Sequence, residues 1–108
     1  MSYNISAIPS FKKEFKKLAK KYPSLKSDLQ KLSEELIENP TLGIDLGGNF
    51  YKVRMSITSK GRGKSGGARI ITHIKIIETT IFLTSIYDKS DKDSISDKEL
   101  NQLLNKIE

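Results

Sequence analysis

The chain of 108 residues contains no cysteine and only one histidine. Without cysteine it cannot form a disulfide, a zinc–thiolate site or a thiol nucleophile. A single histidine, His73, also excludes a metal site built from several imidazoles. We therefore expect neither a metal nor a cofactor.

Long apolar segments are missing as well. No run approaches the roughly 20 apolar residues that cross a bilayer. The N-terminal "MSYNISAIPSF" lacks the basic start and apolar core of a secretory signal. We therefore expect a cytoplasmic protein with no membrane partner. The length predicts one domain over residues 1–108, and no repeat or linker divides it.

Acidic residues are absent from the middle of the chain. The net charge is +6, yet residues 51–75 alone hold seven cations and no acid. Residues 11–22 hold six lysines against one glutamate, while the acids gather at 34–38 and 88–99. This segregation favours a polyanionic partner, RNA or DNA, through Coulomb attraction and counterion release. A solvated basic surface kept for solubility is the alternative.

The first half of the chain predicts a strand and two helices. "YNISAI" alternates apolar and polar residues, as a short strand does. A helix should follow, with Ser10 as a plausible N-cap and Pro23 as its stop. Ser24 can cap a second helix, which Asn39-Pro40 ends. Helices joined so closely should form an antiparallel hairpin.

From residue 50 apolar residues recur at every second position, which indicates strands. The segments "YKVRMSI", "ARIITHIKII" and "TIFLTSIYD" predict three consecutive antiparallel strands. Ser96 and Glu99 then have the spacing of a capping box that opens a last helix. The expected order is β-α-α-β-β-β-α, an α+β domain with its helices against one face of an antiparallel sheet.

The stretch "KGRGKSGGAR", residues 60–69, resembles the end of a phosphate-binding P-loop. A P-loop requires a further glycine at position 58, where this chain has Thr58. It also requires a following helix, whereas "GGARIITHIKII" has the composition of a strand. We therefore interpret the stretch as a hairpin loop, with glycines supplying unusual backbone angles.

The segment "KSGGARIITHIK", followed by "IFLTSIYDKSDKDSIS" and a closing helix, resembles the RelE-type toxins of bacterial type II toxin–antitoxin modules. Within that superfamily it is most similar to the HigB-like branch. The resemblance covers nearly the whole chain and implies a RelE-like fold. It also implies a ribosome-dependent mRNA endoribonuclease, an mRNA interferase, that works in the decoding site without metal.

In such an enzyme the ribose 2′-hydroxyl attacks its own phosphodiester. The protein deprotonates that hydroxyl, neutralises the phosphorane charge and protonates the leaving 5′-oxygen, largely by positioning and electrostatics. The implied partners are the ribosome, mRNA and a cognate antitoxin. A ParE-like toxin that inhibits DNA gyrase without catalysis is one alternative, because one fold serves both functions. A basic RNA-binding module without activity is another.

The resemblance points to five catalytic candidates. Arg69 aligns with the family's arginine after the G-G-x turn, and its guanidinium could clamp a phosphate from the strand surface. Lys52 and Arg54 match a basic pair on the preceding strand, where Lys52 is the more plausible base. Lys89 could stabilise the phosphate or protonate the leaving oxygen. His73 shares the strand face of Arg69 and suits acid–base work at neutral pH.

Each candidate also has a structural interpretation. Arg69 could form a surface ion pair, Lys89 could pair with nearby aspartates, and His73 could be a packed strand residue. Tyr87 could stack on a base in place of the family's aromatic residue, or it could belong to the core. Five further cations are predicted to contact RNA, namely Lys60, Arg62, Lys64, Lys75 and Lys92.

Overall fold

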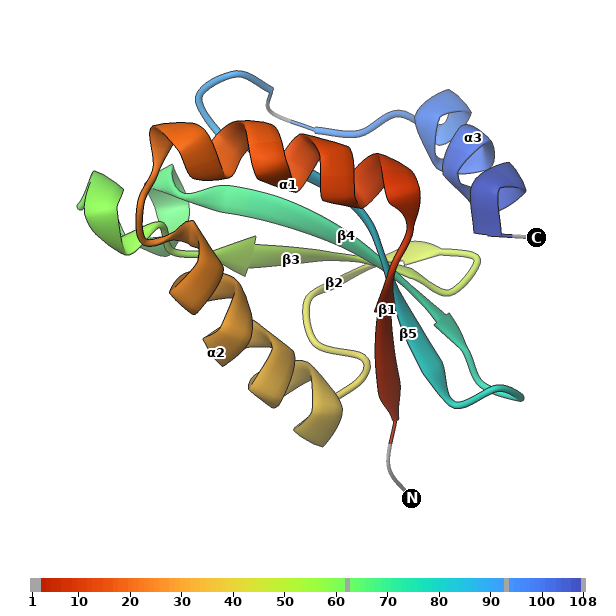
Figure 1. Ribbon diagram of the computed structural model, residues 1–108. Coiled ribbons are helices and arrows are strands. Elements are labelled where there is room, and N and C mark those ends of the chain that lie inside the picture. The colour runs from red at the N-terminus through yellow and green to blue at the C-terminus, as the bar shows by residue number, and fades with distance from the viewer. Residues whose placement is uncertain (1–2, 62, 93, 108) are drawn as a thin grey trace.

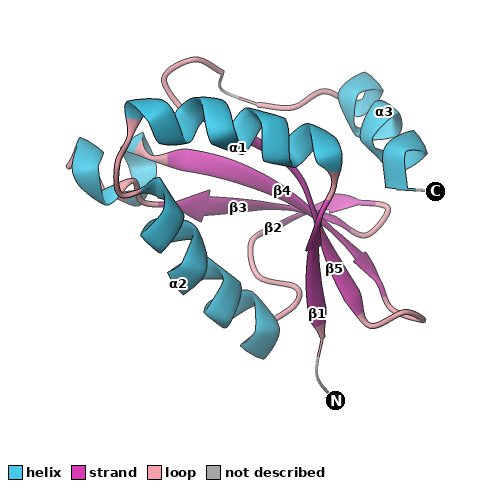
Figure 2. Ribbon diagram, viewed as in Figure 1, coloured by secondary structure: helices cyan, strands magenta, loops and turns pink. Residues whose placement is uncertain are grey.

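The computed structural model describes residues 3–61, 63–92 and 94–107, and it contains one sheet and three α-helices (Figures 1 and 2). Within these ranges no helix is long and apolar enough to cross a membrane. The elements are β1 (Asn4–Ala7), α1 (Pro9–Lys21), α2 (Leu25–Glu38), β2 (Ile44–Gly47), β3 (Phe50–Met55), β4 (Ala68–Lys75), β5 (Thr80–Asp88) and α3 (Asp97–Ile107), with short 3-10 turns at Thr58–Lys60 and Lys64–Gly66.

The five strands lie in the order β1-β5-β4-β3-β2. The expected antiparallel run of three strands is confirmed as β3, β4 and β5. Two features differ from the expected pattern: β1 joins β5 in parallel, and β2 adds a fifth strand beside β3. The added strand is short and irregular, because its register with β3 shifts between Asp45 and Gly47.

The helical hairpin covers one face of the sheet. Phe11 of α1 and Leu25, Leu32 and Leu36 of α2 are buried against strand residues such as Ile70. The expected start of α1 was wrong, because Ile8 is the N-cap and Pro9 opens the helix. Proline suits this position, since the first helical N–H has no intrahelical acceptor.

The C-terminal helix packs on the opposite face, so the expectation that all helices share one face was wrong. Leu100 and Leu103 of α3 form a second core with Phe50, Ile71 and Tyr87. The predicted capping box at its start is confirmed. The Ser96 hydroxyl accepts the Glu99 N–H at 3.1 Å, and the Glu99 carboxylate accepts the Ser96 N–H at 3.1 Å.

Candidate functional site

A row of three side chains crosses the central strands at one end of the sheet. Arg54 of β3 pairs with Arg69 of β4, and Arg69 pairs on its other side with Tyr87 of β5. Lys52 lies two residues before Arg54 and therefore points to the same face. Helix α3 lies toward the other end of these strands (Figure 1). The structure thus brings Lys52, Arg54 and Arg69 together on one face.

A groove of about 530 Å³ runs between α2 and the outer edge of β3. Its floor is apolar and includes Leu32, Val53 and Met55. Two of the catalytic candidates line it, together with one predicted RNA-binding lysine and a lysine of α2. These four cations are Lys52, Arg54, Lys64 and Lys31, and the carboxylates of Asp28 and Glu35 accompany them.

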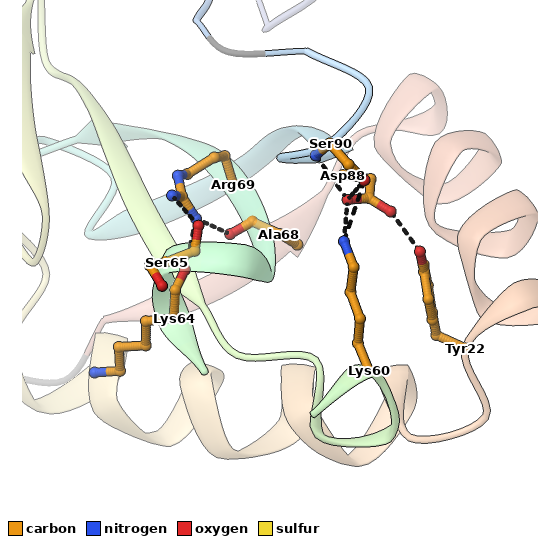
Figure 3. Close-up of polar contacts among 8 residues, drawn as sticks. All are labelled: Tyr22, Lys60, Lys64, Ser65, Ala68, Arg69, Asp88 and Ser90. Carbon is orange, nitrogen blue, oxygen red and sulfur yellow. Dashed lines mark hydrogen bonds and ion pairs between the residues drawn. The ribbon is translucent and has the colours of Figure 1, made fainter. Parts of the chain in front are cut away.

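Arg69 is buried, with only 3 % of its surface exposed. Its Nη1 donates to the carbonyl oxygens of Lys64 at 2.8 Å and Ala68 at 3.1 Å, and its Nη2 donates to that of Ser65 at 3.3 Å (Figure 3). The expectation of a surface arginine was therefore wrong. The guanidinium binds the backbone of the K-S-G-G turn, and these hydrogen bonds hold the turn in place beside Arg54.

The carboxylate of Asp88, at the end of β5, has no exposed surface. It accepts hydrogen bonds at 2.6 Å from Lys60 Nζ, from the Tyr22 hydroxyl and from the Ser90 hydroxyl (Figure 3). Burial alone would raise the pKa of this carboxyl, but the hydrogen bonds from Lys60, Ser90 and Tyr22 outweigh burial and hold the pKa well below its ordinary value. Asp88 therefore ties the end of α1 to the β3–β4 connection.

Asp28 of α2 provides a second anchor for the same connection. Its carboxylate accepts the Thr58 N–H at 2.9 Å, the Thr58 hydroxyl at 2.6 Å and the Ser24 hydroxyl at 2.7 Å. Burial raises the pKa of the Asp28 carboxyl, but the bonds from Thr58 and Ser24 lower it by more. Ser24 holds the N-cap position as expected, but its hydroxyl bonds Asp28 and Ser59 rather than a helical N–H.

Gly67 explains why the K-S-G-G turn needs glycine. A Cβ atom at this position would lie 2.1 Å from the carbonyl oxygen of Met55, so only glycine permits this close approach. The Gly67 carbonyl also accepts the Lys89 N–H at 3.0 Å. Lys89 thus lies at the same end of the sheet as Arg69.

His73 lies away from the arginine row. It is four residues from Arg69 on β4, a separation of roughly 13 Å, and it is 6 % exposed. Its ring packs edge-on against Phe50, with the ring centroids 4.5 Å apart. The structure does not bring His73 to the arginine row. Tyr87 is likewise buried in the α3 core rather than presented to a ligand.

The five predicted RNA-binding cations have different surroundings. Lys64 is exposed in the groove, and Arg62 lies outside the described residues. Lys60 binds the buried Asp88. Lys92 pairs with Glu99 and lies 5.1 Å from the centroid of the Tyr87 ring, and Lys75 is 3.8 Å from Glu78 near the β4–β5 turn.

Sequence reasoning missed Tyr22, Asp28 and Lys31 as neighbours of the site, and it considered Asp88, one of the aspartates near Lys89, only as a local partner of that lysine. Tyr22 bonds Asp88 and Asp28 bonds Thr58, both far away in the sequence, and Lys31 reaches the groove only through the packing of α2, so no local pattern marked them. Among the residues that the structure describes, no three histidine or acidic side chains gather as a metal site would require.

The fold defined by this sheet and its helices is that of a known class of bacterial toxin. The free E. coli toxin RelE, solved as a double arginine-to-alanine variant, matches with a TM-score of 0.66 at 16% identity, over 100% of both chains. The intact E. coli RelBE toxin–antitoxin complex matches with a TM-score of 0.61 at 19% identity, over 80% of this chain and 95% of that one. A RelBE toxin–antitoxin complex from Mycobacterium tuberculosis matches with a TM-score of 0.58 at 14% identity, over 82% and 99%.

The family model described as the RelE toxin of the RelE / RelB toxin–antitoxin system matches residues 10–107. The chain therefore belongs to the RelE toxin family.

Proposed function

We propose that this chain is the toxin of a type II toxin–antitoxin module and cleaves mRNA on the ribosome without metal. The observation that carries the proposal is the convergence of Lys52 and Arg54, beside Arg69, on one groove of a RelE-family protein. Preorganised cations suit a reaction in which negative charge develops on a phosphate.

The geometry supports separate roles for these cations. Arg54 is exposed, and its guanidinium can bind two phosphate oxygens at once. Lys52 lies two residues before Arg54 on the same strand, and it is our candidate for the base that takes the 2′-hydroxyl proton. Lys89 is our candidate for the acid that protonates the leaving 5′-oxygen. Arg69 contributes positive charge beside Arg54 and holds the turn in place.

Membership of the RelE family and the clustered positive charge of the chain indicate which partners to expect. We propose a cognate antitoxin that holds the toxin inactive, and action in the cytoplasm at the ribosomal decoding site. The 2′-hydroxyl required for the reaction restricts the substrate to RNA.

Induced expression in a bacterium, followed by mapping of new mRNA 5′ ends, tests the proposal. We expect growth arrest with breaks inside translated codons, and no breaks when translation initiation is blocked. Purified toxin should cut mRNA in a translation extract and leave a gyrase supercoiling reaction unchanged. Growth arrest with intact mRNA, or inhibition of supercoiling instead, would overturn the proposal.

A further inference from the structure

Helix α1 carries a second cationic surface, distinct from the groove. Its six lysines are all exposed, whereas Phe11, Phe15 and Leu18 face the sheet. Lys13, Lys16, Lys17 and Lys20 recur at i, i+3, i+4 and i+7, which places them in one stripe pointing away from the sheet. We call these four residues the α1 lysine stripe.

No acid neutralises this stripe within the described parts of the chain. The one acid of α1, Glu14, turns toward β5, where its carboxylate accepts the Ser85 hydroxyl at 3.5 Å and the Ile86 N–H at 3.4 Å. Ion pairs between described residues involve lysines outside the stripe, among them Lys60, Lys75 and Lys92. The stripe therefore presents its charge to solvent.

The arrangement opposes helix stability. Lys13 and Lys17, like Lys16 and Lys20, are like-charge neighbours at i and i+4, and such pairs destabilise a helix. Interspersed lysines and glutamates would give the same solubility without this repulsion. A stripe of one sign is thus better explained by a polyanion that it binds than by solubility.

The stripe and the groove are separate surfaces, because the stripe points outward from α1 whereas the groove lies between α2 and β3. The apolar side of α1 packs on the face that carries Ile70 and Ile81, whereas Arg54 and Arg69 lie on the other face. Figure 1 shows α1 running along the outside of the sheet. The stripe is therefore carried by a helix that does not line the groove, and it is available to a second segment of RNA.

The composition of the stripe favours a phosphate backbone over an acidic protein. Protein interfaces are depleted in lysine and depend on buried aromatic or arginine anchors. The outward side of α1 offers no exposed large apolar residue. Lysines are common donors to nucleic-acid phosphates, and Lys13 to Lys20 spans roughly 10 Å of helix, enough for more than one phosphate.

We propose that the α1 lysine stripe binds the phosphate backbone of a structured RNA at the same time as the groove holds the RNA to be cut. In the setting of the proposed function, on which this identification rests, that structured RNA is ribosomal. The stripe contributes to the affinity for RNA, and the groove holds the residues proposed to cleave it.

The salt dependence of binding tests the stripe separately from cleavage. The probe is a fluorescein-labelled RNA hairpin with 2′-O-methyl riboses, which cannot undergo 2′-hydroxyl attack, and anisotropy reports binding. Lys13→Gln with Lys17→Gln should lower the slope of log K against log salt by about 1.4 to 1.8, or 0.7 to 0.9 for each lost phosphate contact. The matched control, Lys98→Gln with Lys106→Gln on α3, removes the same charge and should keep the wild-type slope.

An unchanged slope in the stripe variant, or an equal loss in the α3 control, would overturn the proposal. Loss of binding to an acidic protein segment, with RNA binding intact, would assign the stripe to a protein partner and overturn it too. Because the probe cannot be cleaved, failure of the endonuclease proposal would leave this result readable. Cosedimentation with 30S subunits should fall in parallel with hairpin binding.

Discussion

Replacing Asp88 by asparagine tests whether the buried carboxylate holds the β3–β4 connection. Asparagine keeps the shape but removes the charge that binds Lys60 Nζ at 2.6 Å. Breaking a buried pair by removing one partner costs about 3 to 5 kcal/mol. Because the Lys60 side chain keeps 14% exposure, we expect the lower end, about 3 kcal/mol. That corresponds to a fall of roughly 12 °C in Tm for a domain of this size.

The pH dependence of the difference in Tm between wild type and Asp88→Asn distinguishes loss of charge from loss of packing. The pKa of Asp88 is lowered in the folded state, so its contribution is fully present above its unfolded pKa, about 3.9, and is lost as pH falls below that value. The difference in Tm between wild type and Asp88→Asn should therefore be full at pH 7 and shrink in acid. Thermal melting followed by circular dichroism measures both.

Asp91→Asn is the matched control, since Asp91 is exposed and lies three residues away. It removes the same charge and should change stability by no more than about 0.5 kcal/mol. A difference at pH 7 below about 1 kcal/mol for Asp88→Asn, or one that does not change with pH, would refute the anchoring role of the carboxylate.

Three further substitutions examine the site. Arg54→Gln should abolish toxicity and mRNA cleavage with Tm almost unchanged, because Arg54 is exposed; full toxicity would remove it from the site. Arg69→Ala should lower stability by about 1 to 3 kcal/mol in urea unfolding, because it removes the guanidinium hydrogen bonds to three carbonyl oxygens; Arg69→Lys should recover only part, and unchanged stability would contradict this role. Gly67→Ala should cost about 1 to 3 kcal/mol through its clash with Met55, and a wild-type urea midpoint would show that the turn can shift.

Local sequence patterns were sufficient to predict most of the fold. The apolar stripes of α1 and α2, the alternation in β3 and the capping box of α3 are properties of neighbouring residues. Local patterns could not predict which face of the sheet α3 covers. Seven of the eight residues of β4 are buried, on both faces, so its sequence lacks an alternation that would mark one side as solvated. Strand β2 was missed because it has only four residues and lies among glycines at 43, 47 and 48, so the alternation of Ile44 and Leu46 is too short to mark a strand.

The candidate site was partly predictable for a similar reason. The period of a strand places Lys52 and Arg54 on one face, and the K-S-G-G-x-R motif places Arg69 near them. Spacing cannot tell which cation of a basic segment has a buried carboxylate as its partner. Lys60 binds Asp88 across 28 residues, and Asp28 holds Thr58 across 30 residues. Both contacts depend on how the helical hairpin meets the sheet.

These contacts divide the acid-free segment of residues 51–75 into two kinds of cation. Lys60 and Arg69 are largely buried and bind protein oxygens, so their charge fixes the connection between β3 and β4. Lys52, Arg54 and Lys64 line the groove. A cation held on a fixed frame needs little reorganisation when charge develops on a phosphate. Lys60 and Arg69 can therefore affect the proposed cleavage without touching RNA. If the chain cleaves RNA as proposed, Asp88→Asn should weaken cleavage by displacing the groove cations while leaving each of them present.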